Sequence, residues 1–128
     1  MKIEIRNGLP HVTVALFHGG QQLELPDVLL DTGSAGSVFS ADKLSLIGLA
    51  YEPADTVHRI RGVGGSEFVF TKQVDRIAMD GLHRDAFNIE VGALDYGMNI
   101  SGILGTDFLV AVGAVIDLAR LEVHQGVP

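Results

Sequence analysis

The sequence contains no cysteine. This absence excludes disulfide bonds, a thiolate nucleophile and cysteine-ligated zinc sites. Histidine, another common zinc ligand, occurs five times, but the five positions are scattered and no two are spaced for one helix face. The glycine-rich segment 61–66 lacks both G-x-G-x-x-G and G-K-[ST], the patterns typical of nucleotide binding. We therefore expect neither a metal nor a cofactor.

Basic residues are scarce. Nine lysines and arginines stand against sixteen aspartates and glutamates, so the formal net charge is -7. Binding to phosphate groups needs a basic face, which this composition does not favour. We expect no nucleic-acid partner and interpret the acidity as that of a solvated surface.

Long hydrophobic runs are also missing. No apolar stretch approaches the roughly 20 residues that cross a bilayer. Residues 1–6 alternate apolar and charged side chains and lack the apolar region of a signal peptide. These two absences predict no membrane association and a cytoplasmic protein.

The composition indicates a compact, turn-rich β protein. The 128 residues suffice for one domain with its own core, and we expect a single domain over residues 1–128. Hydrophobic residues make up 47% of the chain, and 16 residues are glycine. Both values favour a folded β protein over a disordered chain.

Alternating apolar residues and turn signals predict the strands. Residues 11–17 and 21–25 read as a hairpin around His18-Gly19-Gly20, whose glycines can adopt positive φ. We expect Pro26 to break the ladder before the apolar residues 28–30. The further strands are predicted at 38–40, 56–60, 67–71, 74–79, 87–91, 114–118 and 121–124.

Two helices are predicted. A short one covers residues 41–44, with Ser40 as its N-cap. The other covers residues 106–112. The segments 56–60 and 67–71 flank the glycines of 61–66, so a hairpin is the natural interpretation there.

The most informative motif is Asp31-Thr32-Gly33-Ser34, which directly follows the apolar run 28–30. A carboxylate at the end of a buried strand is a candidate for acid–base chemistry. Thr32 and Ser34 can bond it, and Gly33 allows the backbone to approach closely. The alternative is a structural aspartate that caps a turn through its side chain.

Two further elements follow in a fixed order, the glycine-rich segment 61–66 and the apolar-apolar-Gly element Ile103-Leu104-Gly105. With the Asp31 motif, they resemble the single-domain, retropepsin-like aspartic proteases over roughly residues 9 to 118. The resemblance implies an all-β fold: a closed barrel lobe with a β-hairpin flap and one short C-terminal helix.

The resemblance also implies roles for individual residues. Asp31 would be the catalytic residue, supported by Thr32, Gly33 and Ser34 of the same loop. The flap would contain Gly62, Val63, Gly64 and Gly65, and substrate would contact Leu29, Ala35, Val63 and Ile103.

At two positions the chain departs from the viral members of the family. Viral enzymes carry an Asp and an Arg that form an ion pair where this sequence has Ala35 and Thr106. Both partners are missing together, so no charge is left unpaired. This departure places the chain nearer the cellular and bacterial members and leaves open how the loop is braced.

The chemistry of aspartic proteases needs two carboxylates, one to take a proton from water and one to protonate the scissile carbonyl. This sequence has a single Asp-Thr-Gly, and 128 residues are too few for two lobes. A twofold homodimer would bring Asp31 beside its own copy. In the resembled family the Thr32 hydroxyl bonds across that axis, and Ser34 occupies the position that bonds the carboxylate.

We therefore expect an aspartic endopeptidase that acts on peptides or proteins as a homodimer. The rival hypothesis is a non-catalytic peptide-binding or dimerisation module that retains the fold. Two other polar residues have non-catalytic interpretations. His58 is expected at the surface of a hairpin arm, and Asp107 is expected to bond loop backbone.

Overall fold

The computed structural model describes residues 1–62, 65–94, 97 and 99–127. Most of these residues lie in strands. In chain order the elements are β1 (Glu4–Arg6), β2 (Leu9–His18), β3 (Gln21–Leu30), β4 (Val38–Ser40), α1 (Ala41–Leu44), the 3-10 helix η1 (Ser45–Ile47), β5 (Val57–Gly62), β6 (Gly65–Met79), β7 (Leu82–Gly92), β8 (Gly102–Leu104), α2 (Thr106–Ala111), β9 (Ala114–Asp117) and β10 (Glu122–Gln125).

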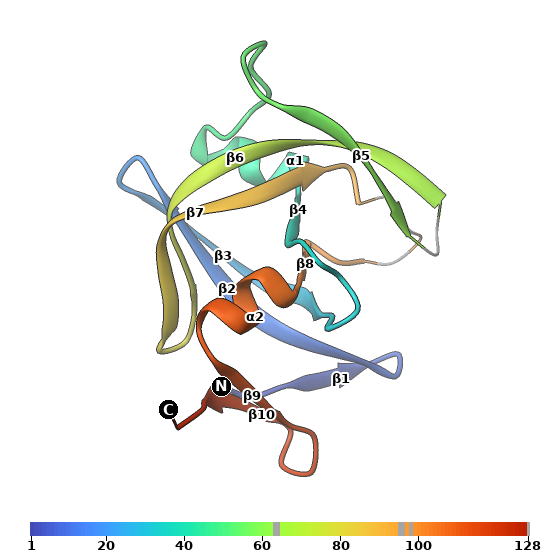
Figure 1. Ribbon diagram of the computed structural model, residues 1–128, viewed down its shortest axis with the longest axis vertical. Helices are drawn as coiled ribbons and strands as arrows, with labels where there is room; N and C mark the ends of the chain where they lie inside the picture. The colour runs from blue at the N-terminus through green and yellow to red at the C-terminus, as the bar shows by residue number, and fades with distance from the viewer. Residues whose placement is uncertain (63–64, 95–96, 98, 128) are drawn as a thin grey trace.

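In the described part of the chain, eight strands form one sheet in the order β1-β2-β3-β8-β4-β7-β6-β5. β2 also pairs with β6, which closes the sheet on itself. Figure 1 shows the long β6 curving over the molecule and meeting β2 at the left of the view. β9 and β10 form a separate two-stranded sheet. This arrangement confirms the predicted all-β, closed-barrel lobe.

The β2–β3 hairpin turns at the predicted glycines. Gly19 and Gly20 have φ values of 58° and 79°, in the left-handed region that glycine enters without strain. Two consecutive residues of this kind give the turn whose twist matches the flanking strands. A short-range sequence signal was therefore sufficient to locate this hairpin.

Pro26 lies inside β3, so the expectation that it breaks the ladder is wrong. The reason is a register shift between the pairs Val12↔Val28 and Val14↔Leu25, where β3 advances three residues while β2 advances two. A bulge leaves one residue outside the regular hydrogen-bond ladder. A proline, which has no N–H to donate, is tolerated at such a place.

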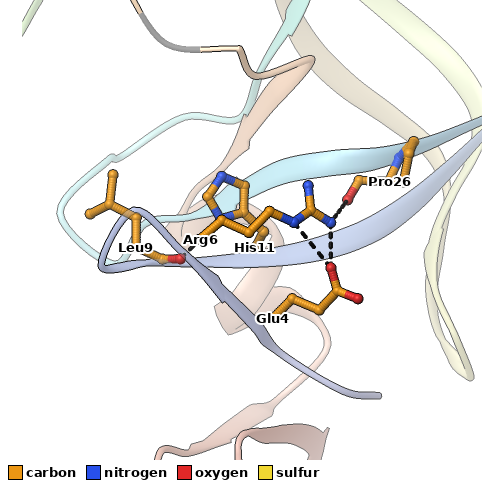
Figure 2. A network of polar contacts seen from close by, with 5 residues as sticks. All are labelled: Glu4, Arg6, Leu9, His11 and Pro26. Carbon is orange, nitrogen blue, oxygen red and sulfur yellow. Dashed lines mark hydrogen bonds and ion pairs between the residues drawn. The ribbon is translucent and has the colours of Figure 1, made fainter.

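The side chain of Arg6 ties the β1–β2 hairpin to β3 beside this bulge. Its guanidinium donates to the carbonyl of Pro26 and pairs with the carboxylate of Glu4 (Figure 2). Figure 2 also shows the His11 ring next to the carbonyl of Leu9, with Nδ1 at 2.9 Å from that oxygen. These contacts hold β1 at one edge of the sheet.

β6 is one continuous strand, where the sequence predicted separate strands at 67–71 and 74–79. The polar residues Lys72 and Gln73 do not interrupt it, because they pair with Ile89 and Asn88 of β7. Cross-strand pairing thus extends a strand through residues whose local pattern predicts a break.

The core fills the inside of the barrel. Val14, Leu16, Phe39 and Phe108 are fully buried. The ring of Phe87 meets the ring of Phe108 edge to face, with centroids 5.9 Å apart. Burying each side chain of this size contributes about 1.5–3 kcal/mol. Phe108 belongs to α2, so α2 is anchored in the barrel core.

The helices are short. Ser40 is the N-cap of α1, as predicted, although its side chain makes no capping hydrogen bond. α2 ends at Ala111, one residue before the predicted end. No helix among the described residues has the length and apolar character needed to cross a membrane.

The two ends of the chain lie together. Ile3 N donates to Leu121 O at 2.8 Å, and Val123 N donates to Met1 O at 2.8 Å. Figure 1 shows the N-terminus beside β9 and β10 at the bottom of the molecule. The C-terminal hairpin is therefore joined to the N-terminal residues of the same chain.

Candidate active site

Two segments that are far apart in the sequence meet at the Asp31 loop. β8 runs parallel to β3, with the pairs Leu29↔Ile103 and Leu30↔Leu104. The ladder continues by one bond, in which Asp31 N donates to Leu104 O at 3.0 Å. The apolar run 28–30 before Asp31 and the element Ile103-Leu104-Gly105 thus lie on neighbouring strands that end at the same place.

The turn after β3 orients the carboxylate of Asp31. Gly33 N donates to Oδ1 of Asp31 at 2.8 Å, and Ser34 N donates to the Asp31 carbonyl at 3.2 Å. A Cβ on Gly33 would lie 3.1 Å from the same Oδ1, so a side chain there would crowd the carboxylate. Asp31 itself is partly buried, whereas Thr32 and Gly33 are exposed.

The resemblance implied that the Ser34 hydroxyl bonds the Asp31 carboxylate, but in this structure it does not. It donates instead to the carbonyl of Gly36 at 2.7 Å, within the same loop. The loop brings Gly36 O within reach of the Ser34 hydroxyl, which donates its hydrogen there. Ser34 therefore shapes the loop in this chain.

Position 105 requires glycine because the backbone of the Asp31 loop lies too close to leave room for a side chain. A Cβ at this position would lie 2.6 Å from both Ser34 O and Gly36 O. Thr106 follows directly, and its N–H and hydroxyl both donate to Ser34 O, at 2.8 and 3.2 Å. The start of α2 thus packs directly on the Asp31 loop.

Asp107 bonds the loop, as predicted. Its Oδ2 accepts from Ser37 N at 3.0 Å, and its Oδ1 accepts from Ser37 Oγ at 2.7 Å. Ser37 is fully buried, and sequence reasoning did not single it out. The signal available was a hydroxyl residue immediately before the apolar Val38-Phe39, where a buried polar group needs a partner.

A family model described as aspartyl protease matches residues 12–108. The chain belongs to the aspartyl protease family. The match spans both the Asp31 loop and the Gly105 turn, which the parallel strands β3 and β8 bring together. No curated protein matches this aspartyl protease chain in sequence.

The β5–β6 hairpin lies where the sequence predicted a glycine-rich hairpin in this family member. Its strands are paired in register from Val57↔Phe70 to Gly62↔Gly65. Val63 and Gly64, which were predicted to belong to the flap, lie outside the described residues.

One face of this hairpin packs toward the strands that carry the loop. Val69 of β6 forms a buried cluster with Val38 of β4 and with Leu94, and Ile60 and Ile103 pack against it. Of the residues predicted to contact substrate, Ile103 is thus partly buried in this cluster. Leu29 is 8% exposed, and Ala35 is exposed on the Asp31 loop. Val63, the remaining one, is not described.

A polar contact crosses from the hairpin to the body of the protein. His58 Nε2 of β5 lies 3.1 Å from Oε1 of Glu90 on β7. The other oxygen of Glu90 accepts from Thr71 Oγ1 at 3.1 Å. Glu90 N in turn donates to Ser37 O at 2.9 Å. The expected surface position of His58 is confirmed, since its side chain is 42% exposed, and its partner Glu90 was not foreseen.

Proposed function

We propose that the protein is an aspartic endopeptidase whose active site forms between two copies of the chain. The observation that carries the proposal is the Asp31 loop: a carboxylate oriented by Gly33 N–H at the end of a buried strand, in a member of the aspartyl protease family. A binding module has no need of an oriented carboxylate at this place.

In the proposed reaction the two Asp31 carboxyl groups share one proton across a twofold axis. The ionised group removes a proton from water, and the water oxygen attacks the scissile carbonyl carbon. The protonated group donates its proton to the carbonyl oxygen. When the tetrahedral intermediate collapses, the C–N bond breaks and the leaving nitrogen takes up the proton that was removed from water. The carboxylate that protonated the carbonyl oxygen recovers a proton from the diol.

The need for two copies is supported by the sequence and by exposure. The chain has one Asp-Thr-Gly. In the described structure Thr32, Gly33 and Ala35 are exposed, so the outer surface of the Asp31 loop is open for a second chain to cover. A C2 axis at this surface would place identical residues opposite each other, with Thr32 available to bond across it.

The β5–β6 hairpin is proposed to act as the flap over a bound peptide. Its packing on Val38 and Ile103, and the His58–Glu90 contact, support a position above the strands that lead to Asp31. An extended peptide between the hairpin and Asp31 would pair with main-chain groups as an added strand.

The deciding experiment is cleavage of a peptide library between pH 4 and pH 7, read by mass spectrometry, for wild type and for Asp31→Asn. We expect wild type to cleave internal peptide bonds and the isosteric variant to lose cleavage while retaining its fold. The matched control is Asp42→Asn, the same chemical change at an exposed residue of α1. Its cleavage should equal that of wild type.

The rival hypothesis, a non-catalytic peptide-binding or dimerisation module, predicts a different result. Wild type would then bind peptides or form dimers without cleaving them, and Asp31→Asn would behave like wild type. Cleavage that survives in purified Asp31→Asn would contradict the aspartic mechanism.

A further inference from the structure

The exit of the Asp31 loop is attached to α2 through one pair of side chains, Ser37 and Asp107. Both oxygens of the Asp107 carboxylate are used: Oδ2 accepts from Ser37 N, and Oδ1 accepts from Ser37 Oγ and from Phe108 N. The Ser37 hydroxyl is also an acceptor, because Gly105 N donates to it at 3.0 Å. One carboxylate and one hydroxyl thus connect three backbone N–H groups.

The Ser37 side of this network is buried, and the Asp107 side is partly buried. Ser37 is 0% exposed, and the bond from Gly105 N to its hydroxyl is buried. A buried donor or acceptor that loses its partner keeps the full cost of its desolvation. The network therefore specifies one arrangement of the loop relative to the start of α2.

The other contacts of the loop use backbone carbonyls. Ser34 O accepts from Thr106, Asp31 N donates to Leu104 O, and Ser37 O accepts from Glu90 N. Ser37–Asp107 is thus the place where side chains on both segments join the loop to α2. Gly33 and Gly36 lie between the two attached ends, and glycine adds backbone freedom there.

The chemistry of position 107 favours a carboxylate over an amide. Three donors converge on its two oxygens, and an amide would offer one oxygen and an NH2 group. Among the described residues, the polar contacts of the Asp107 side chain are these hydrogen bonds and no ion pair. Ala35 and Thr106, where viral relatives carry an ion pair, hold no charge here.

We propose that Asp107 is a positioning residue for Asp31. It holds Ser37, and through Ser37 it keeps the 31–37 loop in the arrangement in which Gly33 N–H orients the Asp31 carboxylate. Asp107 acts through this loop and does not touch the substrate. The expected effect on kcat rests on the proposed peptidase function. The expected effect on the bond between Gly33 N and Asp31 does not depend on catalysis.

The test uses Asp107→Asn and Ser37→Ala in the full chain. In Asp107→Asn the amide NH2 faces a backbone N–H in either orientation, that of Ser37 or that of Phe108, so one bond is replaced by two opposed donors. We expect kcat for a cleaved peptide to fall on the order of tenfold to a hundredfold, with KM changed far less, because a small misplacement of a reacting group has this effect. The control is Asp117→Asn, which alters a comparable bond from Arg120 N in the β9–β10 turn and should leave kcat unchanged.

A second measurement does not depend on turnover. Hydrogen exchange of the Gly33 amide, followed by NMR, reports the bond between Gly33 N and Oδ1 of Asp31. Protection of this amide should fall in Asp107→Asn and stay at the wild-type level in Asp117→Asn. If wild type has no peptidase activity, the proposed function fails. Protection of the Gly33 amide then still tests whether Asp107 positions the loop.

A double variant provides the last check. If both residues act through the same contact, Asp107→Asn combined with Ser37→Ala should lower kcat no further than the worse single variant. The positioning role is overturned if Asp107→Asn folds with wild-type kcat and wild-type Gly33 protection. It is also overturned if stability falls while both of these readouts stay unchanged. Should Ser37→Ala fail to fold, Asp107→Asn alone decides between these results.

Discussion

At the scale of single residues, close backbone contacts as well as hydrogen bonds limit which residues the Asp31 loop accepts. Gly105 and Gly36, two glycines of the same site, differ in the space that each leaves for a side chain. A Cβ on Gly105 would meet two backbone carbonyls at 2.6 Å, whereas a Cβ on Gly36 would meet only the flexible Glu90 side chain, at 3.9 Å. The first position excludes a side chain, and the second has room for a methyl group.

Gly105→Ala should therefore destabilise the protein. Overpacking typically costs about 1–3 kcal/mol, and we expect the upper part of this range because backbone atoms cannot move aside as a side-chain end can. Urea unfolding measures the change. The matched control is Gly36→Ala, for which we expect a change within about 0.5 kcal/mol. Equal unfolding midpoints for the two variants would show that the loop adjusts to a side chain at position 105.

At the scale of elements, a partly buried lysine, Lys72, joins the loop before β5 to the middle of β6. Lys72 Nζ lies 2.8 Å from Oε1 of Glu52 and 2.9 Å from Oδ2 of Asp55. The Lys72 ammonium, followed by the N–H of Glu52, lowers the pKa of Asp55 below its usual 3.8. Hydrogen bonds to Glu52 and then to Asp55 raise the pKa of Lys72 above 10.5.

These pKa directions predict an acid-dependent stability. Because the pKa of Asp55 is lower in the folded state, its stabilisation is present above the unfolded value near 3.8 and disappears as the pH falls through the folded value. Lys72, with a raised pKa, changes stability only at strongly alkaline pH. We therefore expect Asp55→Asn to unfold at lower urea than wild type from about pH 7 to pH 5, with the difference shrinking below about pH 4.

The control for this series is Asp42→Asn, which should follow the wild-type curve throughout. A difference between wild type and Asp55→Asn that stays constant down to about pH 2 would contradict the ion-pair explanation.

At the scale of the whole molecule, the proposed site is incomplete in one chain, so activity should depend on pairing. Mixing wild type with a ninefold excess of Asp31→Asn should lower the activity per wild-type chain to about one tenth, because random pairing leaves few wild-type homodimers. Mixing with Asp42→Asn chains should leave the activity per total chain unchanged. Dilution should lower specific activity as dimers dissociate, which analytical ultracentrifugation follows.

A monomeric species with constant specific activity at every dilution would rule out the shared site.

The proton count of the shared pair predicts the pH profile. In the proposed mechanism the pair shares one proton between two carboxylates, so activity should fall in strong acid, where both are protonated, and again where both are ionised. We expect a bell-shaped dependence of kcat/KM on the acidic side of neutral. Activity that keeps rising to about pH 9 would contradict the shared-proton mechanism.

Local features of this protein were determined by its sequence alone. The Gly19-Gly20 turn, the β5–β6 hairpin and helix α2 follow from turn residues and apolar spacing, because positive φ and strand alternation are requirements of a few adjacent residues. The order of three motifs was enough to predict the family and Asp31 as its candidate site. The role of Asp31 in catalysis stays a prediction.

Other features were decided only by the tertiary structure. Pro26 is accommodated because the β2–β3 register shifts beside it, and β6 continues through Lys72 because β7 pairs with it. The contact between Ser37 and Asp107 joins residues 70 positions apart. It exists because β3 and β8 lie parallel and end together, and no local pattern specifies which distant strand becomes a neighbour.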